Sequence, residues 1–200
     1  MPFTNDGLDM LVSHDFSRLT ACEARSLASE FPGRSAWLTQ FAMRRMFHAH
    51  VSEERSALAF VLIRRAEAAL DEWELACETA SRAPGAPSVY FKALRHFEAS
   101  ITALYQGLEF GRNALGTKFF EKGDGSVIQR INSLYNKSRH FDPSDLPSGR
   151  LHAVWFGNDC LRTNEIAVTF TELRDVLAEV CRVANTLATA SELRLDTTKT

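Results

Sequence analysis

One helical pattern constrains the fold of this chain more than any other feature. Between residues 88 and 114, apolar side chains recur with spacings of 4, 3, 4, 3 and 4 residues, at Tyr90, Leu94, Phe97, Ile101, Leu104 and Leu108. These spacings place all of them on one face of an α-helix. Such a face is stable when neighbouring helices pack along it, so the pattern predicts a helical bundle.

Five further segments have helical patterns or helix signals, and they are residues 17–30, 35–50, 52–81, 126–141 and 171–190. Ser52 precedes two glutamates and fits a helix N-cap, while Thr169 with Glu172 fits a capping box. Residues 35–50 and 52–81 form either two helices or one long rod through His50. Residues 152–168 contain a β-like stretch, which is either a small hairpin or an ordered crossover.

We therefore expect an all-α protein with a bundle of about five to six helices and a short β-like hairpin or extended crossover near residues 151–168. A chain of 200 residues with 45% hydrophobic residues is long enough to build one core. We expect a single helical domain over residues 1–200. Within it, residues 1–50 are a helical N-terminal extension, residues 52–190 are the bundle, and residues 191–200 are a frayed tail.

Charge and cysteine content exclude several classes of protein. The net charge of −2 excludes a strongly basic coat for nucleic acid, although it leaves room for a local basic patch. The sequence has no long apolar run and no secretory signal at its start, so we expect no membrane association and a cytoplasmic location. The four cysteines form no C-x-x-C pair, which predicts free thiols in a reducing compartment.

The densest group of polar residues lies in the predicted helix 126–141. Asn132, Asn136 and His140 are four residues apart and therefore share one helical face, and Arg130, Lys137 and Arg139 accompany them. In a functional interpretation His140 is an acid or base near neutral pH, Asn136 and Arg139 position a phosphate, and the other residues bind the ligand. In a structural interpretation His140 stabilises the helix C-terminus and the amides bond to the following loop.

Other chemistry-bearing residues give weaker signals. Arg45 and His50 have an R-x4-H spacing, His96 lies beside the apolar face of helix 88–114, and Trp155 either stacks a base or covers the core. No phosphate-binding glycine loop, nucleophile elbow or metal-ligand motif is present in the sequence. We therefore expect no metal and no cofactor.

The order of these segments resembles the HEPN superfamily, in particular its poorly characterised bacterial members. The resemblance covers about residues 55–190 and rests on YFKALRHFEASITALYQGLEFGR (90–112), IQRINSLYNKSRHFD (128–142), an extended crossover and a last amphipathic helix. It implies a helical bundle, often dimeric, found in toxins, antiphage systems and RNA-processing enzymes. Active members carry R-x4–6-H, often with Asn after the Arg; here Asn136 and His140 match, but Tyr135 stands at the Arg position.

Two possible functions follow from this resemblance and from the departure of Tyr135 from the family pattern. The first is a HEPN-like binding or interaction module of an RNA-related or defence-type bacterial system, with RNA, protein or a second copy of the chain as partner. The residues expected to contact the partner are Arg130, Asn132, Tyr135, Lys137 and Trp155. The alternative is a metal-independent endoribonuclease of toxin type, in which His140, Asn136 and Arg139 are catalytic. Because Tyr135 has no permanent cation to stabilise a phosphorane-like transition state, we favour binding.

Overall fold

The computed structural model describes residues 5–12, 16–47, 52–115, 118–139, 146 and 151–189. Within these ranges the fold is mainly helical, as predicted, with a small antiparallel sheet. The helices are α1 (Asn5–Leu11), α2 (Trp37–Phe47), α3 (Glu53–Ala80), α4 (Pro87–Leu115), α5 (Val127–Arg139) and α6 (Phe170–Thr189), and a 3-10 turn, η1 (Arg34–Ala36), precedes α2. The strands are β1 (Trp155–Phe156), β2 (Cys160–Arg162) and β3 (Ala167–Thr169).

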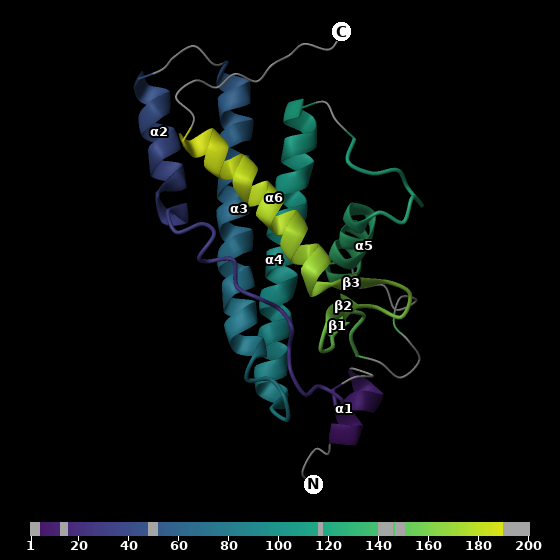
Figure 1. Ribbon diagram of the computed structural model, residues 1–200. Coiled ribbons are helices and arrows are strands. Elements are labelled where there is room, and N and C mark those ends of the chain that lie inside the picture. Colours follow the sequence, from purple (N-terminus) through teal and green to yellow (C-terminus); the bar gives the residue numbers. More distant parts are fainter. Residues whose placement is uncertain are drawn as a thin grey trace.

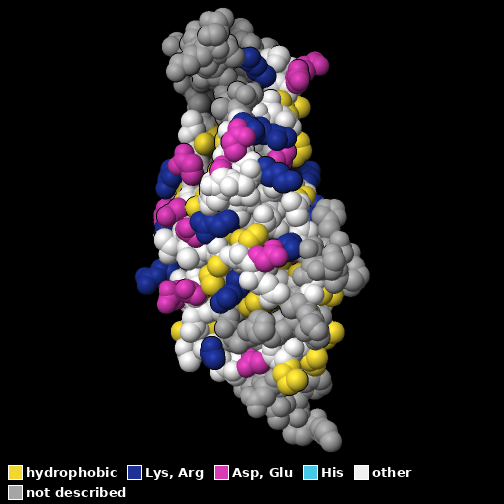
Figure 2. Space-filling view, turned by 90° about the vertical axis from the view of Figure 1, so that its right-hand side faces the viewer, with side chains coloured by type: hydrophobic (Ala, Val, Ile, Leu, Met, Phe, Trp, Pro, Cys, Tyr) yellow, Lys and Arg dark blue, Asp and Glu magenta, His cyan; other side chains and the backbone are white. Residues whose placement is uncertain are grey.

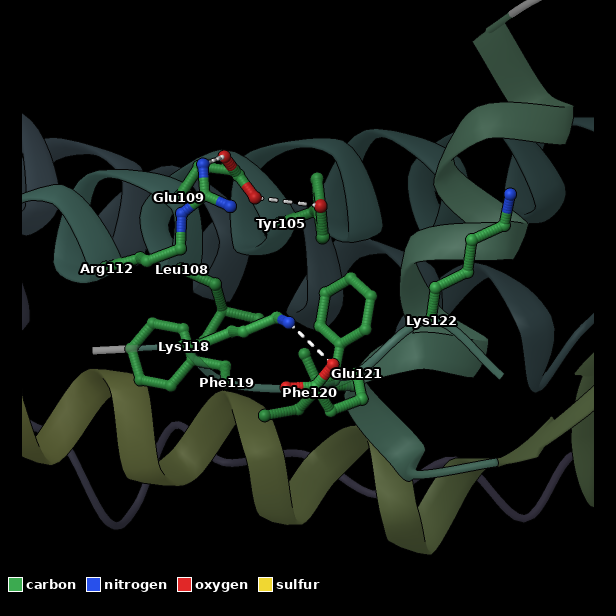
Figure 3. A pocket seen from close by; sticks show the side chains of 10 residues that line it. Tyr105, Leu108, Glu109, Arg112, Lys118, Phe119, Phe120, Glu121 and Lys122 are labelled. Carbon is green, nitrogen blue, oxygen red and sulfur yellow. Dashed lines mark hydrogen bonds and ion pairs between the residues drawn. The ribbon is translucent and has the colours of Figure 1, made fainter. Parts of the chain in front are cut away.

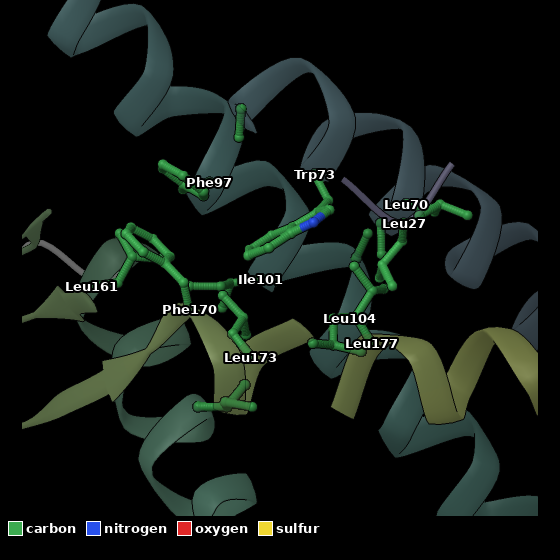
Figure 4. Packing of buried hydrophobic residues seen from close by; sticks show 14 of the residues in the cluster. Leu27, Leu70, Trp73, Phe97, Ile101, Leu104, Leu161, Phe170, Leu173 and Leu177 are labelled. Atoms are coloured by element: carbon green, nitrogen blue, oxygen red, sulfur yellow. The ribbon is translucent and has the colours of Figure 1, made fainter. Parts of the chain in front are cut away.

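The two longest helices, α3 and α4, lie side by side and antiparallel, and α6 crosses them obliquely (Figure 1). The turn between α3 and α4 contains Gly85, whose φ of 70° lies in the left-handed region that favours glycine. The pattern predicted over residues 88–114 is buried along α4, where Phe97 and Leu104 have 0% exposure. Figure 4 shows these side chains packed against Trp73 of α3 and Leu173 and Leu177 of α6.

Helices α2 and α3 are separate, which excludes the long rod. The rings of Phe41 and Phe60 are 6.3 Å apart. In one continuous helix, residues that far apart in sequence would be separated by about 28 Å along the axis. Ser52 caps α3 as predicted, because its side chain accepts a hydrogen bond from the Arg55 backbone N–H.

The predicted helix over residues 17–30 is wrong. Residues 16–33, which we call the strap, run over α3 without helical structure. Side chains of α3 form hydrogen bonds with the backbone of the strap. Trp73 Nε1 donates to the Arg25 carbonyl over 2.9 Å, and Glu74 accepts from the Leu27 N–H over 2.7 Å. Leu27 itself has 0% exposure and belongs to the same core as the bundle. Tertiary hydrogen bonds therefore replace the helical ones in the strap.

The β-like stretch forms a three-stranded antiparallel sheet in the order β1-β2-β3. Phe156 pairs with Leu161, and Leu161 pairs with Val168. The predicted hairpin is therefore present and is extended by a third strand. The capping box that starts α6 is also confirmed: Thr169 Oγ1 accepts from the Glu172 N–H over 3.1 Å, and Glu172 accepts from the Thr169 N–H over 3.0 Å.

In the part of the chain that the structure describes, no helix is both long and apolar enough to cross a membrane.

Candidate ligand-binding surface on α4 and α5

Two members of the polar row predicted on residues 126–141, Asn132 and Asn136, lie in α5. The Asn136 side-chain amide donates to the Asn132 side-chain oxygen over 3.0 Å, so these two residues share a face. Ile131 and Leu134 are fully buried and hold the opposite face of α5 on the bundle. His140, the predicted acid or base, lies outside the described residues, as do His50 of the Arg45–His50 spacing and the predicted tail 191–200.

Arg130 joins three elements of the fold. Its guanidinium donates to both carboxylate oxygens of Glu172, over 2.7 and 3.1 Å, and to the Ala167 carbonyl over 2.7 Å. Hydrogen bonds from the Arg130 guanidinium and from Thr169 lower the pKa of Glu172 from 4.5 to about 2. The cation of Arg130, which we expected to bind a ligand, is therefore neutralised inside the protein and ties α5 to β3 and α6.

Tyr135, which is half-buried against the core, and the exposed Arg139 form a stack on α5. The Arg139 guanidinium donates to the Tyr135 hydroxyl over 2.8 Å and lies 5.4 Å from the centre of the Tyr135 ring. The Tyr135 ring also lies 4.7 Å from the ring of Tyr105 on α4, tilted by 32°. Lys137 lies 3.9 Å from the exposed carboxylate of Glu165. The cation–ring stack therefore continues from the end of α5 to α4.

Trp155 does not belong to this surface. Its side chain has 1% exposure and lies in the hydrophobic core, so the expectation that it stacks a base is wrong and its role in covering the core is confirmed. His96 does not face α5 either. Its Nδ1 lies 2.7 Å from the Glu72 carboxylate, and this contact joins α4 to α3.

A pocket of about 300 Å³ opens where the Tyr105 end of the stack meets the loop that precedes α5. Figure 3 shows side chains from α4 on one side and from the loop on the other. The lining residues are Tyr105, Leu108, Glu109, Arg112, Lys118, Phe119, Phe120, Glu121, Lys122 and Ile128. This volume is at the lower end of the range for small-molecule sites.

The polar groups of the pocket are arranged in a set of three on α4 and a pair on the loop. Glu109 accepts from the Tyr105 hydroxyl over 2.9 Å and from Arg112 over 2.7 Å, both along one face of α4. Burial and the bond to Glu109 raise the pKa of Tyr105 to about 12, so its hydroxyl stays protonated and donates. Across the pocket, the Lys118 ammonium lies 2.6 Å from Glu121, and both side chains are largely exposed.

The sequence contains one signal for this pocket. Phe119 and Phe120 lie in a glycine-bounded loop between two lysines, a pattern that by itself predicts only that the two rings anchor the loop. Phe119 does pack against the core, and it also lines the pocket. Tyr105 cannot be selected from sequence, because its neighbours Tyr135 and Phe119 are brought to it only by the tertiary fold.

Cysteines and acidic residues supply no further reactive centre within the described ranges. No group of three or more His, Cys, Asp or Glu side chains there could hold a metal ion. The four cysteines are free thiols. Burial raises the pKa of Cys22 to about 11 and the pKa of Cys77 and Cys181 to about 12, which keeps them as unreactive thiols at neutral pH.

A scan against protein-family models found no match to this chain, and searches of curated proteins and of solved structures also found none.

Proposed function

We propose that this protein is a HEPN-like binding module that holds a single RNA strand on the surface formed by α4 and α5. The observation that carries the proposal is the continuous stack of Arg139, Tyr135 and Tyr105. Aromatic rings and arginine planes stack unpaired bases, and nearby cations attract the phosphates. Helix α5 contains no acidic residue, and besides Arg130, which is paired with Glu172, it carries the basic residues Lys137 and Arg139.

The charge distribution supports local recognition rather than a broad electrostatic surface. Figure 2, turned toward the α5 side of the molecule, shows Lys and Arg mixed with Asp and Glu. With a net charge of −2, phosphate contacts alone would bind RNA weakly. Stacking and hydrogen bonds to the bases must therefore contribute a large part of the affinity.

Binding is favoured over cleavage by the positions of the cations. A metal-independent ribonuclease needs a cation that is free to stabilise the charge on the phosphate in the transition state. Arg130 is engaged by Glu172, and Arg139 lies on Tyr135, which itself replaces the arginine of the HEPN pattern. The endoribonuclease that uses His140 is thus the alternative, and it is tested in the same experiment.

The resemblance also suggests the cellular role of the module, which is part of an RNA-related or defence-type bacterial system, and its assembly as a homodimer. Its location would be the cytoplasm, where free thiols such as the four found here stay reduced. Sedimentation of the purified protein measures the dimer, and a monomer at high concentration would contradict that part.

The binding test uses fluorescence anisotropy of a labelled single-stranded RNA with the full chain. Tyr135→Ala removes the central ring of the stack, and we expect about a tenfold weaker affinity, because one stacked base contributes about 1–3 kcal/mol. The control is Phe91→Ala, which removes a ring that is 43% exposed near the other end of α4. Equal affinities of wild type and Tyr135→Ala would contradict the role of the stack, and no binding by wild type would overturn the proposal.

The cleavage arm incubates the same RNA with EDTA, wild type and His140→Ala. A binding module leaves the RNA intact in every sample. Cleavage by wild type that is lost in His140→Ala would establish the ribonuclease alternative instead.

A further inference from the structure

We propose that the pocket between α4 and the 118–122 loop binds a guanine base that carries a phosphate. This inference rests on the proposed function when the base belongs to the bound RNA strand. The same chemistry is also offered by a free guanine nucleotide, and the experiment below separates the two sources. In the first case the pocket would select the position of guanine along the strand.

The walls of the pocket suit one planar aromatic ring. Tyr105, Phe119 and Phe120 line it from two sides, and its volume of about 300 Å³ is at the small end for ligand sites. One base fits such a space. The pocket is also continuous with the surface stack, because Tyr105 belongs to both. A strand lying along α5 therefore reaches the pocket without leaving the protein surface.

Glu109 explains why guanine is favoured among the four bases. A carboxylate has about four acceptor positions, and Glu109 uses one for the Tyr105 hydroxyl and one for Arg112. The remaining positions match the two adjacent N–H donors on the Watson–Crick edge of guanine, the ring imino group and the exocyclic amino group. Uracil presents one donor there, and adenine and cytosine present an amino group beside an acceptor nitrogen. A carboxylate therefore forms a bidentate pair only with guanine.

Two cations at the rim complement the phosphate. Arg112 is held near Glu109 with a side chain that is 45% exposed, so donors remain directed toward solvent. Lys118 is paired with Glu121, but both side chains are more than half exposed. Exposed pairs of this kind contribute little free energy, so Lys118 can exchange Glu121 for a phosphate at small cost.

The experiment compares two labelled oligouridylates of equal length, about eight nucleotides, one of which carries a single central guanosine. Free GMP and UMP are titrated separately by calorimetry. We expect the guanosine strand to bind about tenfold more tightly than the plain strand, and GMP to bind more tightly than UMP. Glu109→Gln should abolish both preferences, because an amide presents a donor where guanine needs an acceptor.

The matched control is Glu179→Gln. Glu179 pairs with Arg182 three residues later on α6, just as Glu109 pairs with Arg112 on α4, and it does not line the pocket. Glu179→Gln should keep the guanine preference. Thermal unfolding of both variants shows that the fold is retained, and Phe120→Ala, which removes a wall without changing charge, should weaken GMP binding independently.

The outcomes separate this inference from the proposed function. RNA binding with no guanine preference, or a preference that survives Glu109→Gln, overturns the guanine pocket and leaves the RNA-binding module standing. Binding of GMP that depends on Glu109, with no binding of either strand, supports the pocket as a nucleotide site and overturns the RNA-binding proposal. Absence of binding by both strands and both nucleotides overturns both.

Discussion

Tyr90 shows how one hydroxyl completes the edge of the small sheet. Gly157 N–H donates to the Cys160 carbonyl, so Phe156, one residue earlier, directs its N–H and C=O away from β2. The Tyr90 hydroxyl accepts from the Phe156 N–H over 3.0 Å and donates to the Phe156 carbonyl over 3.1 Å. A single buried side chain thus satisfies both outward groups of the edge strand β1.

Removing this hydroxyl tests its role. Tyr90→Phe keeps the ring, which is stacked on Phe156 at 4.2 Å, but leaves two buried backbone groups without their partner. We expect the free energy of unfolding to fall by about 1–3 kcal/mol, measured by urea unfolding. Tyr105→Phe is the control, because its hydroxyl bonds to a solvent-accessible carboxylate. An unchanged stability for Tyr90→Phe would mean that water replaces the hydroxyl at β1.

Glu172 gives a second prediction at this scale, and it concerns pH. Its carboxylate caps α6 and pairs with Arg130, and its pKa falls from 4.5 to about 2 in the folded state. A carboxyl group whose pKa is lower in the folded state than in the unfolded state stabilises the fold at a pH above its unfolded pKa. This stabilisation is lost as the pH falls toward the folded pKa. We therefore expect Glu172→Gln to be less stable than wild type at pH 7, and this difference to shrink between pH 4.5 and about 2.

The measurement is urea unfolding of both proteins from pH 7 down to about pH 2. At pH 7 the loss should be about 1–2 kcal/mol, since the substitution weakens a capping box and an ion pair. Glu179→Gln on the same helix changes an exposed pair and should stay within about 0.5 kcal/mol of wild type. A Glu172→Gln deficit that is the same at pH 7 and at pH 2 would refute the assigned pKa.

At the scale of elements, α4 contains two glycines that face different surroundings. A Cβ added at Gly107 would lie 3.5 Å from Arg65 Cβ and 3.8 Å from Val180 Cγ1, which are ordinary contacts. A Cβ at Gly111 would lie 3.3 Å from Cδ1 of Leu62, a buried residue of the neighbouring helix α3. Only the second position requires a neighbour to move.

Alanine at each glycine separates helix propensity from close packing. Gly107→Ala should stabilise the protein by about 0.5–1 kcal/mol, because alanine loses less backbone entropy in a helix. Gly111→Ala gains the same propensity but displaces Leu62, so its net change should be about zero or destabilising. Thermal unfolding of the two variants provides the comparison. Equal stabilisation by both would mean that α3 and α4 do not limit the residue at Gly111.

How far the sequence predicts these elements depends on where their hydrogen bonds go. The predicted helix 88–114 agrees with α4 within one residue at each end, and the Thr169–Glu172 box locates the start of α6, because both are local patterns. The strap has a helical pattern but no helix, because its backbone partners, Trp73 and Glu74, lie far along the chain. The third strand, β3, is also not predicted from the sequence. It contains few residues, and it is defined by its pairing with β2 rather than by a local pattern.

At the scale of the whole molecule, the candidate site combines a part that is visible in the sequence and a part that is not. The row on α5 is predictable because its spacing of four residues is a local pattern. The pocket exists only where the end of α4 meets the loop at Phe119, and no local pattern predicts that contact. The fold also changes the interpretation of Arg130. The sequence predicts that this cation binds a ligand, whereas the structure shows that it pairs with Glu172.

The strap leads to a prediction about the molecule as a whole. The sequence pattern divides the chain into an extension and a bundle, whereas the strap contributes Phe16, Leu27 and Phe31 to the same core as α3, α4 and α6. Burial of each such side chain contributes about 1.5–3 kcal/mol. Their combined loss approaches the total stability of a typical domain, about 5–15 kcal/mol. Deletion of residues 1–33 should therefore abolish cooperative unfolding, measured by circular dichroism against temperature.

A milder variant tests the same idea in a chain that still folds. Leu27 has 0% exposure, and Leu27→Ala should lower the free energy of unfolding by about 2–5 kcal/mol. Ser29 is exposed two residues later in the strap, and Ser29→Ala should stay within about 0.5 kcal/mol of wild type. If the deletion and Leu27→Ala both unfold like wild type, the strap lies on the bundle without stabilising it. In that case the rest of the chain would fold without the strap.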